Sequence, residues 1–318
     1  MNSEVWVFSG HGSQWPGMGR ELLEEPAFAK VIDALEPIFL REVGFSPRRV
    51  LTEGSLDRVD RVQTMIFAMQ VGLVELLREQ GAEPAAVIGH SVGEIAAAVT
   101  AGALSIEDGA RLICRRSLLL RRVAGQGAMV MVTLPFDEVE RRLTGHADAA
   151  AVIASAPAAT VVAGSPQVIG QLTRSWKEEG IGTFHLASDV AFHSSHMDPL
   201  LNDLLAATAD LAPRAYEVPV YSTALPDPRT TPAADGAYWA ANLRNPVRLV
   251  AAVSAAVADG HRRFLEISPH PVVAHSIART LTELGVEDGV VIGTLRRNKP
   301  QMQALDSALK TLAARATS

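Results

Sequence analysis

The segment Gly89-His90-Ser91-Val92-Gly93 limits the possible folds of this chain more than any other feature. It fits the pattern G-x-S-x-G and lies between a predicted buried strand, residues 84–89, and a predicted alanine-rich helix, residues 94–101. The glycines permit a tight turn that raises the serine at the top of an α/β sheet. Alone, the pattern also fits an inert glycine turn. Its position between strand and helix favours an α/β fold with Ser91 as a nucleophile.

Three physical effects can activate Ser91. The dipole of the following helix favours negative charge at its N-terminus, and the backbone N–H of Val92 points to where an oxyanion forms. A nearby imidazole can remove the hydroxyl proton. His90 is adjacent but is expected to point along the turn. His193 and His196 remain as candidates, and the residue pattern does not choose between them.

The middle of the chain differs in pattern from its two ends. Residues 20–41, 62–79 and 106–122 are predicted helices of the first part. From residue 127 the order becomes β-α-β-β-α-β, which predicts a ferredoxin-like unit inserted into a larger domain. We therefore expect residues 1–124 and 191–318 to form the large α/β unit. Residues 125–190 form the small one. The strands predicted in the small unit cover 127–134, 149–155, 160–163 and 182–186, and its helices 135–143 and 165–179.

Composition excludes several classes of function. The net charge is −6 and the 29 basic residues are scattered, so no nucleic-acid-binding surface is indicated. No signal peptide and no apolar run of about 18 residues is present, which predicts a cytoplasmic protein without a membrane span. We also expect the protein to be a monomer. The single cysteine, Cys114, rules out an intramolecular disulfide and is expected to be a small buried residue. No His, Cys or Asp spacing suggests a metal site.

Five segments of the sequence form a pattern: Val7-Phe-Ser-Gly-His-Gly-Ser-Gln-Trp-Pro-Gly-Met-Gly, Gly89-His-Ser-Val-Gly-Glu, Ala191-Phe-His-Ser, Tyr238-Trp-Ala-Ala-Asn-Leu-Arg-Asn-Pro-Val-Arg and Phe264-Leu-Glu-Ile-Ser-Pro-His-Pro. Together they resemble the acyltransferase domains of polyketide synthases and, more distantly, malonyl-CoA:carrier-protein transacylases. The resemblance runs from about residue 5 to residue 297 with every motif in order. It implies a large α/β-hydrolase-like domain with a parallel sheet and the small ferredoxin-like insertion.

The resemblance assigns catalytic roles position by position. It makes Ser91 the nucleophile and His193 its base, which leaves His196 as a bystander. The backbone carbonyl of Asn242 is expected to orient the imidazole, giving a Ser-His dyad. The two oxyanion donors are expected to be the backbone N–H groups of Val92 and His11, although the family usually has glutamine at the latter position.

The resemblance also assigns residues to the acyl group. Arg116 matches an arginine that pairs with the free carboxylate of a malonyl group, whereas Arg115 beside it is left as a surface residue. Gln63 matches a glutamine that lines the acyl site. Phe192, with Val190 two positions earlier, resembles the pattern of malonyl-selective members, because a phenylalanine fills the space that an α-methyl group needs. Val190 departs from that pattern, and Ser155 stands where relatives often have asparagine and receives no role.

The resemblance implies transfer of a malonyl-type unit from coenzyme A to the phosphopantetheine of an acyl carrier protein, in polyketide and antibiotic biosynthesis. No bound cofactor is expected. The alternatives are transfer of a methylmalonyl or unusual carrier-bound unit, an editing acyl hydrolase with the same dyad, and a non-catalytic docking module. Because the first strand starts within five residues of Met1, a free-standing enzyme is favoured over an excised synthase domain.

Overall fold

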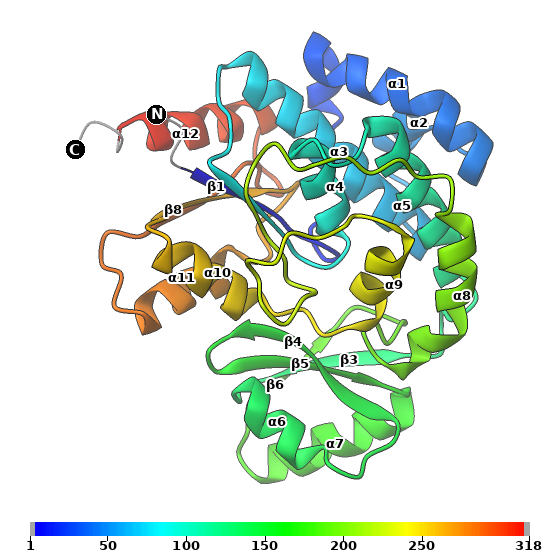
Figure 1. Cartoon of the computed structure of the whole chain (residues 1–318), viewed down its shortest axis with the longest axis vertical. Helices are drawn as coiled ribbons and strands as arrows, with labels where there is room; N and C mark the ends of the chain where they lie inside the picture. The colour runs from blue at the N-terminus through cyan, green and yellow to red at the C-terminus, as the bar shows by residue number, and fades with distance from the viewer. Residues whose placement is uncertain (1–3, 315–318) are drawn as a thin grey trace.

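A computed structural model describes residues 4–314, which form a large α/β unit and a small antiparallel unit (Figure 1). The large unit is built on a five-stranded parallel sheet with the strand order β7-β2-β1-β8-β9. The predicted parallel sheet is therefore confirmed. Its strands are β1 (Glu4–Phe8), β2 (Ala86–Gly89), β7 (Val220–Tyr221), β8 (Arg263–Ile267) and β9 (Val290–Gly293).

The central strand β1 shows how the sequence produces helical layers on both faces of this sheet. Side chains alternate along a strand, so neighbours point to opposite faces. Trp6 and Phe8 belong to the main core with the helices α1, α3, α4 and α5, whereas Val5 and Val7 pack with α10 and α11. The bounds are α1 (Pro26–Val43), α3 (Val59–Glu79), α4 (Gly93–Thr100), α5 (Ile106–Leu120), α10 (Leu249–Ala258) and α11 (Ala274–Glu283).

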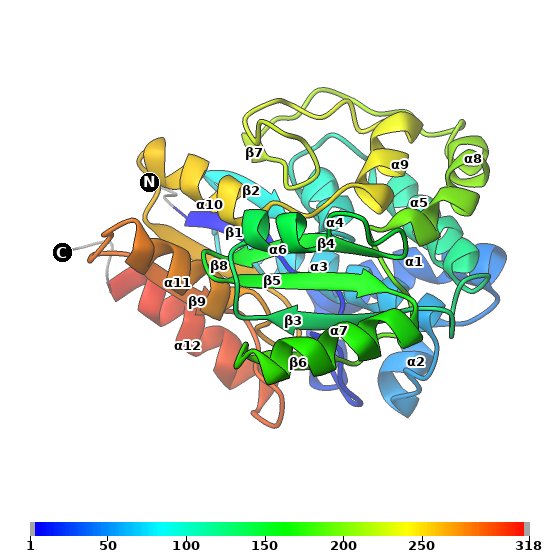
Figure 2. The same ribbon diagram turned by 90° about the horizontal axis from the view of Figure 1, so that it is seen from below.

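The small unit has the strand order β4-β5-β3-β6, and all of its neighbouring strands run antiparallel. This is the β-α-β-β-α-β arrangement expected from the sequence. Its helices α6 and α7 cover the face that points away from the large unit (Figures 1 and 2). The elements are β3 (Ala128–Val132), α6 (Phe136–Arg142), β4 (Ala149–Ala156), β5 (Ala159–Gly164), α7 (Pro166–Glu178) and β6 (Thr183–Leu186).

The chain enters and leaves the small unit at one place. The backbone N–H of Gly127 donates to the carbonyl of Asp189 at 2.9 Å. A Cβ atom at Gly127 would overlap the backbone N of Ala191, so only glycine allows this approach. The face of the small sheet opposite its helices packs on the main core, where Met129 and Val161 contribute side chains. The small sheet thereby covers one side of the large unit with its helix-free face.

The remaining elements complete the large unit. The helix expected over residues 20–41 is divided: a 3-10 turn precedes Glu25, which is extended, and α1 starts at Pro26. Proline suits the first helical position because it has no N–H to leave unpaired. No helix within residues 4–314 is long and apolar enough to cross a membrane. The further elements are η1 (Glu21–Glu24), α2 (Pro47–Glu53), η2 (Ser195–Met197), α8 (Asp198–Ala207), α9 (Gly236–Arg244) and α12 (Gln301–Ala314).

Candidate active site

Ser91 occupies a sharp turn between β2, which ends at Gly89, and α4, which begins at Gly93. Its φ angle is 57°, in the left-handed region that non-glycine residues seldom adopt. Glycine is required at both flanking positions, because the backbone of another residue lies where a Cβ atom would be. A Cβ atom at Gly89 would overlap the backbone of Glu94, and one at Gly93 would overlap the carbonyl of Phe8. The strand-turn-helix arrangement expected around Ser91 is present, and it fixes the hydroxyl above the carboxyl edge of the sheet.

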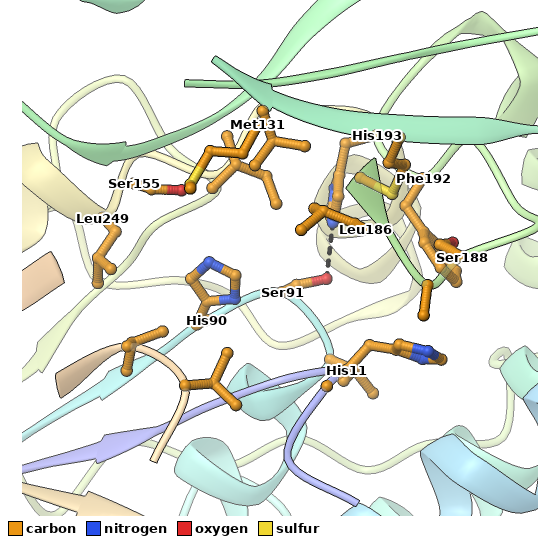
Figure 3. A pocket seen from close by; sticks show the side chains of 18 of the residues that line it. His11, His90, Ser91, Met131, Ser155, Leu186, Ser188, Phe192, His193 and Leu249 are labelled. Atoms are coloured by element: carbon orange, nitrogen blue, oxygen red, sulfur yellow. Dashed lines mark hydrogen bonds between the residues drawn. The ribbon is translucent and has the colours of Figure 1, made fainter. Parts of the chain in front are cut away.

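His193 meets Ser91 from the chain segment that follows the small unit. Its Nε2 lies 2.6 Å from the Ser91 Oγ, which is within hydrogen-bond distance (Figure 3). His193 also has a left-handed backbone, with a φ angle of 61°. The predicted pairing of these two side chains is therefore present. An imidazole so placed can accept the hydroxyl proton as the serine attacks.

The carbonyl that orients His193 is not the predicted one. The Nδ1 of His193 lies 3.0 Å from the backbone oxygen of Asn245, not of Asn242. Asn242 lies inside α9, whereas Asn245 follows its last residue and has extended backbone, with a ψ angle of 155°. A carbonyl beyond a helix end is free of the helical hydrogen-bond pattern and can turn to the imidazole. Proton donation from Nδ1 to this carbonyl leaves Nε2 as the acceptor that faces Ser91.

The side chain of Asn242 has a different contact with the site. Its Nδ2 donates to the carbonyl of Ser91 at 3.2 Å and to Glu94 Oε2 at 3.0 Å. The Glu94 carboxylate is buried and also accepts from the Thr223 amide at 2.7 Å, from the Thr223 hydroxyl at 2.6 Å and from the Tyr238 hydroxyl. Glu94, Thr223 and Tyr238 were given no role from the sequence, and together with the Asn242 side chain they hold the turn that carries the nucleophile. The sequence signal for Glu94 was its place directly after the G-x-S-x-G pattern, as the last residue of the family motif Gly-His-Ser-Val-Gly-Glu.

The electrostatic surroundings keep His193 neutral. Burial, followed by the positive field of Arg116 and by His90, lowers the pKa of His193 to about 3. The carbonyl of Asn245 acts in the opposite direction, and that of Asn242 does so more weakly. A neutral imidazole is the form that can act as a general base.

The expected oxyanion donors lie beside the nucleophile. Val92 caps the N-terminus of α4 and lines the same cavity as Ser91. His11 follows β1 and lies on the side of Ser91 opposite His193 (Figure 3). Within the described part of the chain, neither backbone N–H donates to another residue. Two free amides near a serine can stabilise a tetrahedral oxyanion. His11 departs from the usual glutamine only in its side chain, which the amide does not need.

Ser91 and His193 open into a cavity of about 390 Å³ between the large sheet and the small unit (Figure 3). Gln63 and Phe192 line it, as expected, and so does Ser155. His90 also lines it, which corrects the expectation that its side chain points along the turn. Much of the remaining wall is apolar and had no signal in the sequence. These apolar residues are Met129, Met131, Ile153, Val161, Leu186, Leu249, Val272 and Val273.

Val190 does not reach this cavity. It is fully buried in the main hydrophobic core and is absent from the cavity wall. Side chains at alternate positions of an extended segment share a direction, but the chain between β6 and His193 bends at Asp189 and Val190 and is not a regular strand. The structure therefore places Val190 in the core and not in the cavity wall, where the sequence-based expectation had put it.

Arg116 lies on α5 and is only 1% exposed. None of its three guanidinium nitrogens has a hydrogen-bond partner within residues 4–314, and its side chain does not form part of the cavity wall. Burial lowers its pKa to about 10, while the negative field of Glu94 opposes this effect. Arg115 differs: it pairs with Glu42 and Asp210 at the protein surface. A buried guanidinium without partners is costly, and unpaired groups of this kind occur at binding sites.

His196 lies outside the site, in line with its predicted role as a bystander. Its Nε2 is 2.6 Å from Asp148 Oδ1, so it links the large unit to the small one. Cys114 is buried as expected, and burial raises the pKa of its thiol. Neither residue takes part in the chemistry at Ser91.

The fold and the Ser91–His193 pair fit both acyltransferases and acyl hydrolases, and comparisons with known proteins identify the acyltransferase family. Residues 5–317 match the family model described as "Acyl transferase domain". The chain has 47% identity over 97% of its length to 6-methylsalicylic acid synthase of Aspergillus terreus. It has 48% identity over 97% of its length to 5-methyl-1-naphthoate synthase of Streptomyces sahachiroi. In each case it spans only 17% of the relative's length.

Comparison with solved structures identifies the type of acyltransferase. The acyltransferase domain of the polyketide synthase PpsC of Mycobacterium tuberculosis matches with a TM-score of 0.90 and 39% identity, covering 94% of this chain and 92% of that one. The acyltransferase domain from module 8 of the salinomycin polyketide synthase matches with a TM-score of 0.91 and 36% identity, covering 98% and 74%. This chain belongs to the acyltransferase family and is an acyltransferase domain of the polyketide synthase type.

Proposed function

We propose that this domain transfers a malonyl-type group from coenzyme A to the phosphopantetheine thiol of an acyl carrier protein, through an ester on Ser91. The observation that carries the acyl-group assignment is Arg116, which is buried with three unpartnered nitrogens and acts electrostatically on His193. A planar guanidinium can hold a carboxylate with two parallel hydrogen bonds. A malonyl group has such a carboxylate, and an acetyl group does not.

The first half of the reaction acylates the enzyme. The neutral Nε2 of His193 accepts the proton of Ser91 as the hydroxyl oxygen attacks the thioester carbonyl. The carbonyl oxygen becomes an oxyanion, which the amides of Val92 and His11 stabilise. The carbon–sulfur bond then breaks, and the imidazolium returns its proton to the departing thiolate. The products are malonyl-Ser91 and free coenzyme A.

The second half reverses these steps with a new thiol. The phosphopantetheine thiol gives its proton to His193, and its sulfur attacks the malonyl ester. The same two amides stabilise the second oxyanion. The bond between carbonyl carbon and Ser91 Oγ breaks, and the serine regains its proton from the imidazolium. This order of events is a ping-pong mechanism.

Phe192 supports malonyl over methylmalonyl as the unit transferred. Its ring lies in the cavity wall, with its centroid 6.0 Å from that of His11 and 6.5 Å from that of His193. The Phe192 ring therefore takes up room beside His193, in the part of the cavity where an α-methyl group of the substrate would have to fit. One methyl group in such a pocket changes binding by about 1–3 kcal/mol, so the preference is one of degree.

Intact-protein mass spectrometry after brief mixing with acetyl-, malonyl-, methylmalonyl- and ethylmalonyl-CoA tests the proposal. We expect a malonyl mass increment that is absent in Ser91→Ala and strongly reduced in Arg116→Ala. Arg115→Ala is the matched control, because it removes the neighbouring arginine, which pairs with surface carboxylates. Loading of acetyl in preference to malonyl, or equal loading by Arg116→Ala and Arg115→Ala, would contradict the malonyl assignment.

The acceptor is tested with the loaded enzyme. Malonyl-Ser91 should persist in buffer and lose its acyl group rapidly when a phosphopantetheinylated carrier protein is added, with the malonyl mass appearing on the carrier. Release of free malonate at the same rate with and without carrier would instead identify an editing hydrolase.

A further inference from the structure

Two buried side chains of opposite charge lie near the nucleophile without pairing. Glu94, on α4, and Arg116, on α5, are both buried, and these two helices pack against each other. The field of Glu94 acts on Arg116, so the two charges lie within electrostatic range. Yet the Arg116 guanidinium donates no hydrogen bond within the described part of the chain. In a protein interior, buried charges are usually paired.

The hydrogen bonds of Glu94 explain why its carboxylate does not form an ion pair with Arg116. Oε1 accepts from the backbone N–H and the hydroxyl of Thr223, at 2.7 and 2.6 Å. Oε2 accepts from the Tyr238 hydroxyl and from Asn242 Nδ2. A carboxylate offers about four acceptor positions, and four donors from other elements occupy them. The carboxylate is thus held in place and has no free position for a guanidinium.

Other acidic groups near α5 are engaged elsewhere. Glu42, on α1, and Asp210, after α8, pair with Arg115. Asp108, on α5 itself, pairs with Arg111, and Asp60, on α3, pairs with Arg58. On the side of the site, His193 and His90 have lowered pKa values because both are buried, so they are neutral at physiological pH. Burial raises the pKa of Glu94, and its hydrogen bonds from Thr223, Tyr238 and Asn242 oppose this by stabilising the charged carboxylate. Glu94 is the acidic group whose negative field reaches Arg116.

We propose that Glu94 is a positioning residue that balances the buried charge of Arg116 from a distance, while its four hydrogen bonds keep it from occupying the guanidinium. Arg116 then stays charged and free for the carboxylate of an acyl group. This inference rests on the proposed function. The same carboxylate holds Asn242, which holds the carbonyl of Ser91, so the acyl-recognition residue and the nucleophile depend on one buried anion.

The charge role and the structural role can be separated by pH. Burial lowers the pKa of Arg116 to about 10, and the negative field of Glu94 limits this decrease. Loss of the Glu94 charge therefore lowers the pKa further. A deprotonated Arg116 cannot balance a malonyl carboxylate, so malonyl loading fails above the pKa of Arg116, whereas acetyl loading does not depend on it. The ratio of malonyl to acetyl loading reports the state of Arg116.

The experiment measures this ratio by rapid quench and mass spectrometry from pH 7 to 11 in wild type, Glu94→Gln and Tyr238→Phe. Glu94→Gln removes the charge, whereas Tyr238→Phe removes one hydrogen bond and keeps the charge. We expect the midpoint of the ratio in Glu94→Gln to fall by about one pH unit or more relative to wild type. Tyr238→Phe should keep the wild-type midpoint even if both loading rates decrease.

The outcomes separate this inference from the proposed function. A wild type that does not favour malonyl over acetyl at pH 7 contradicts the proposed function. A wild type that favours malonyl, with the same midpoint in Glu94→Gln and Tyr238→Phe, overturns the inference alone and reduces Glu94 to a structural residue.

A second measurement needs no substrate and therefore does not depend on the catalytic activity of Glu94→Gln. Arg116→Met leaves the Glu94 charge unbalanced and should lower the melting temperature. The double variant Glu94→Gln/Arg116→Met removes both charges, so it should melt no lower than Arg116→Met. If the melting-temperature losses of the two single variants simply add in the double variant, the two charges do not balance each other and the inference is wrong.

Discussion

Ser91 and His193 are 102 residues apart in the sequence, yet both have left-handed backbones and their side chains meet at 2.6 Å. A positive φ angle costs a non-glycine residue about 1 kcal/mol or more, and such residues concentrate at functional sites. Here the unusual backbone occurs at both members of the dyad. For Ser91 it results from the turn that the flanking glycines permit. For His193 it turns the chain as it returns from the small unit, which directs the ring at the serine.

The turn at Ser91 should not tolerate a larger residue at position 93. Gly93→Ala would place a methyl group against the carbonyl of Phe8, on the central strand of the sheet. Because neither backbone can yield, we expect a loss of at least about 2 kcal/mol in the free energy of unfolding, measured by urea denaturation. Gly170→Ala is the control: this helical glycine has only the end of Arg174 near it, so alanine should stabilise by about 0.5–1 kcal/mol. Equal changes in unfolding free energy for Gly93→Ala and Gly170→Ala would contradict the close contact between Gly93 and the Phe8 carbonyl.

The pH dependence of acylation should lack the usual histidine step. Burial and Arg116 lower the pKa of His193 to about 3, so the neutral base is present throughout pH 5–8. We expect the rate of Ser91 acylation by malonyl-CoA to change less than about threefold over this range. A base with an ordinary pKa near 6.5 would lose roughly 30-fold at pH 5. Rapid-quench mass spectrometry measures the rate, and circular dichroism at each pH shows whether the protein is still folded.

The lowered pKa of His193 also affects folding stability, which should decrease as the pH falls. In the unfolded chain His193 binds a proton near pH 6.5, whereas in the folded protein it does so only near pH 3. Between these values the unfolded state holds more protons, so folding stability falls as the pH decreases from about 6.5 toward 3. His90 adds to the effect, because burial lowers its pKa to about 4. A melting temperature that rises between pH 6.5 and pH 4.5 would be inconsistent with both shifts.

The local sequence predicted the elements of this site better than their long-range contacts. The turn at Ser91 could be predicted because its glycines, strand and helix are contiguous. The choice of His193 over His196 could not be made from the residues, because both follow the small unit three positions apart; family resemblance made it. The structure gives the physical difference: the ring of His193 meets Ser91, whereas that of His196 meets Asp148.

The structure departs from the sequence-based expectation at Asn242 and at Val190, and the two differences have the same origin. Which carbonyl faces an imidazole most directly depends on where α9 ends, and element boundaries are the least certain part of a sequence-based prediction. Which side chain enters a cavity depends on the path of the chain, which bends at Asp189 and Val190 before it reaches His193. The role of Glu94 was missed for a further reason: its partners Thr223, Tyr238 and Asn242 lie more than a hundred residues away.

Asn242 should act through its side chain, although the orienting carbonyl belongs to Asn245. Asn242→Ala keeps the backbone and removes the hydrogen bonds to Ser91 and Glu94. We expect a loss of about 1–3 kcal/mol in unfolding free energy, because a buried carboxylate loses a donor, and acylation slowed by roughly tenfold or more through displacement of Ser91. Chemical denaturation and quenched-flow acylation test the two effects. Unchanged stability and acylation in Asn242→Ala would show that the Asn242 side chain has no role in the site and would leave only its backbone carbonyl as a candidate.

Phe192 and Val190 should respond differently to truncation, although both were expected to contact substrate. Phe192 lines the cavity, so Phe192→Ser opens space beside the reacting carbonyl and should raise the ratio of methylmalonyl to malonyl loading by about tenfold or more. Val190 is fully buried in the main core, away from the cavity wall, so Val190→Ala should lower stability by roughly 1–2 kcal/mol and leave that ratio unchanged. Competitive loading from an equimolar mixture of the two thioesters gives the ratio, and urea denaturation gives the stability. A change of the ratio in Val190→Ala equal to that in Phe192→Ser would mean that the segment before His193 acts as one unit in selecting the acyl group. No change in either variant would place the selection outside this segment, among the other residues of the cavity wall.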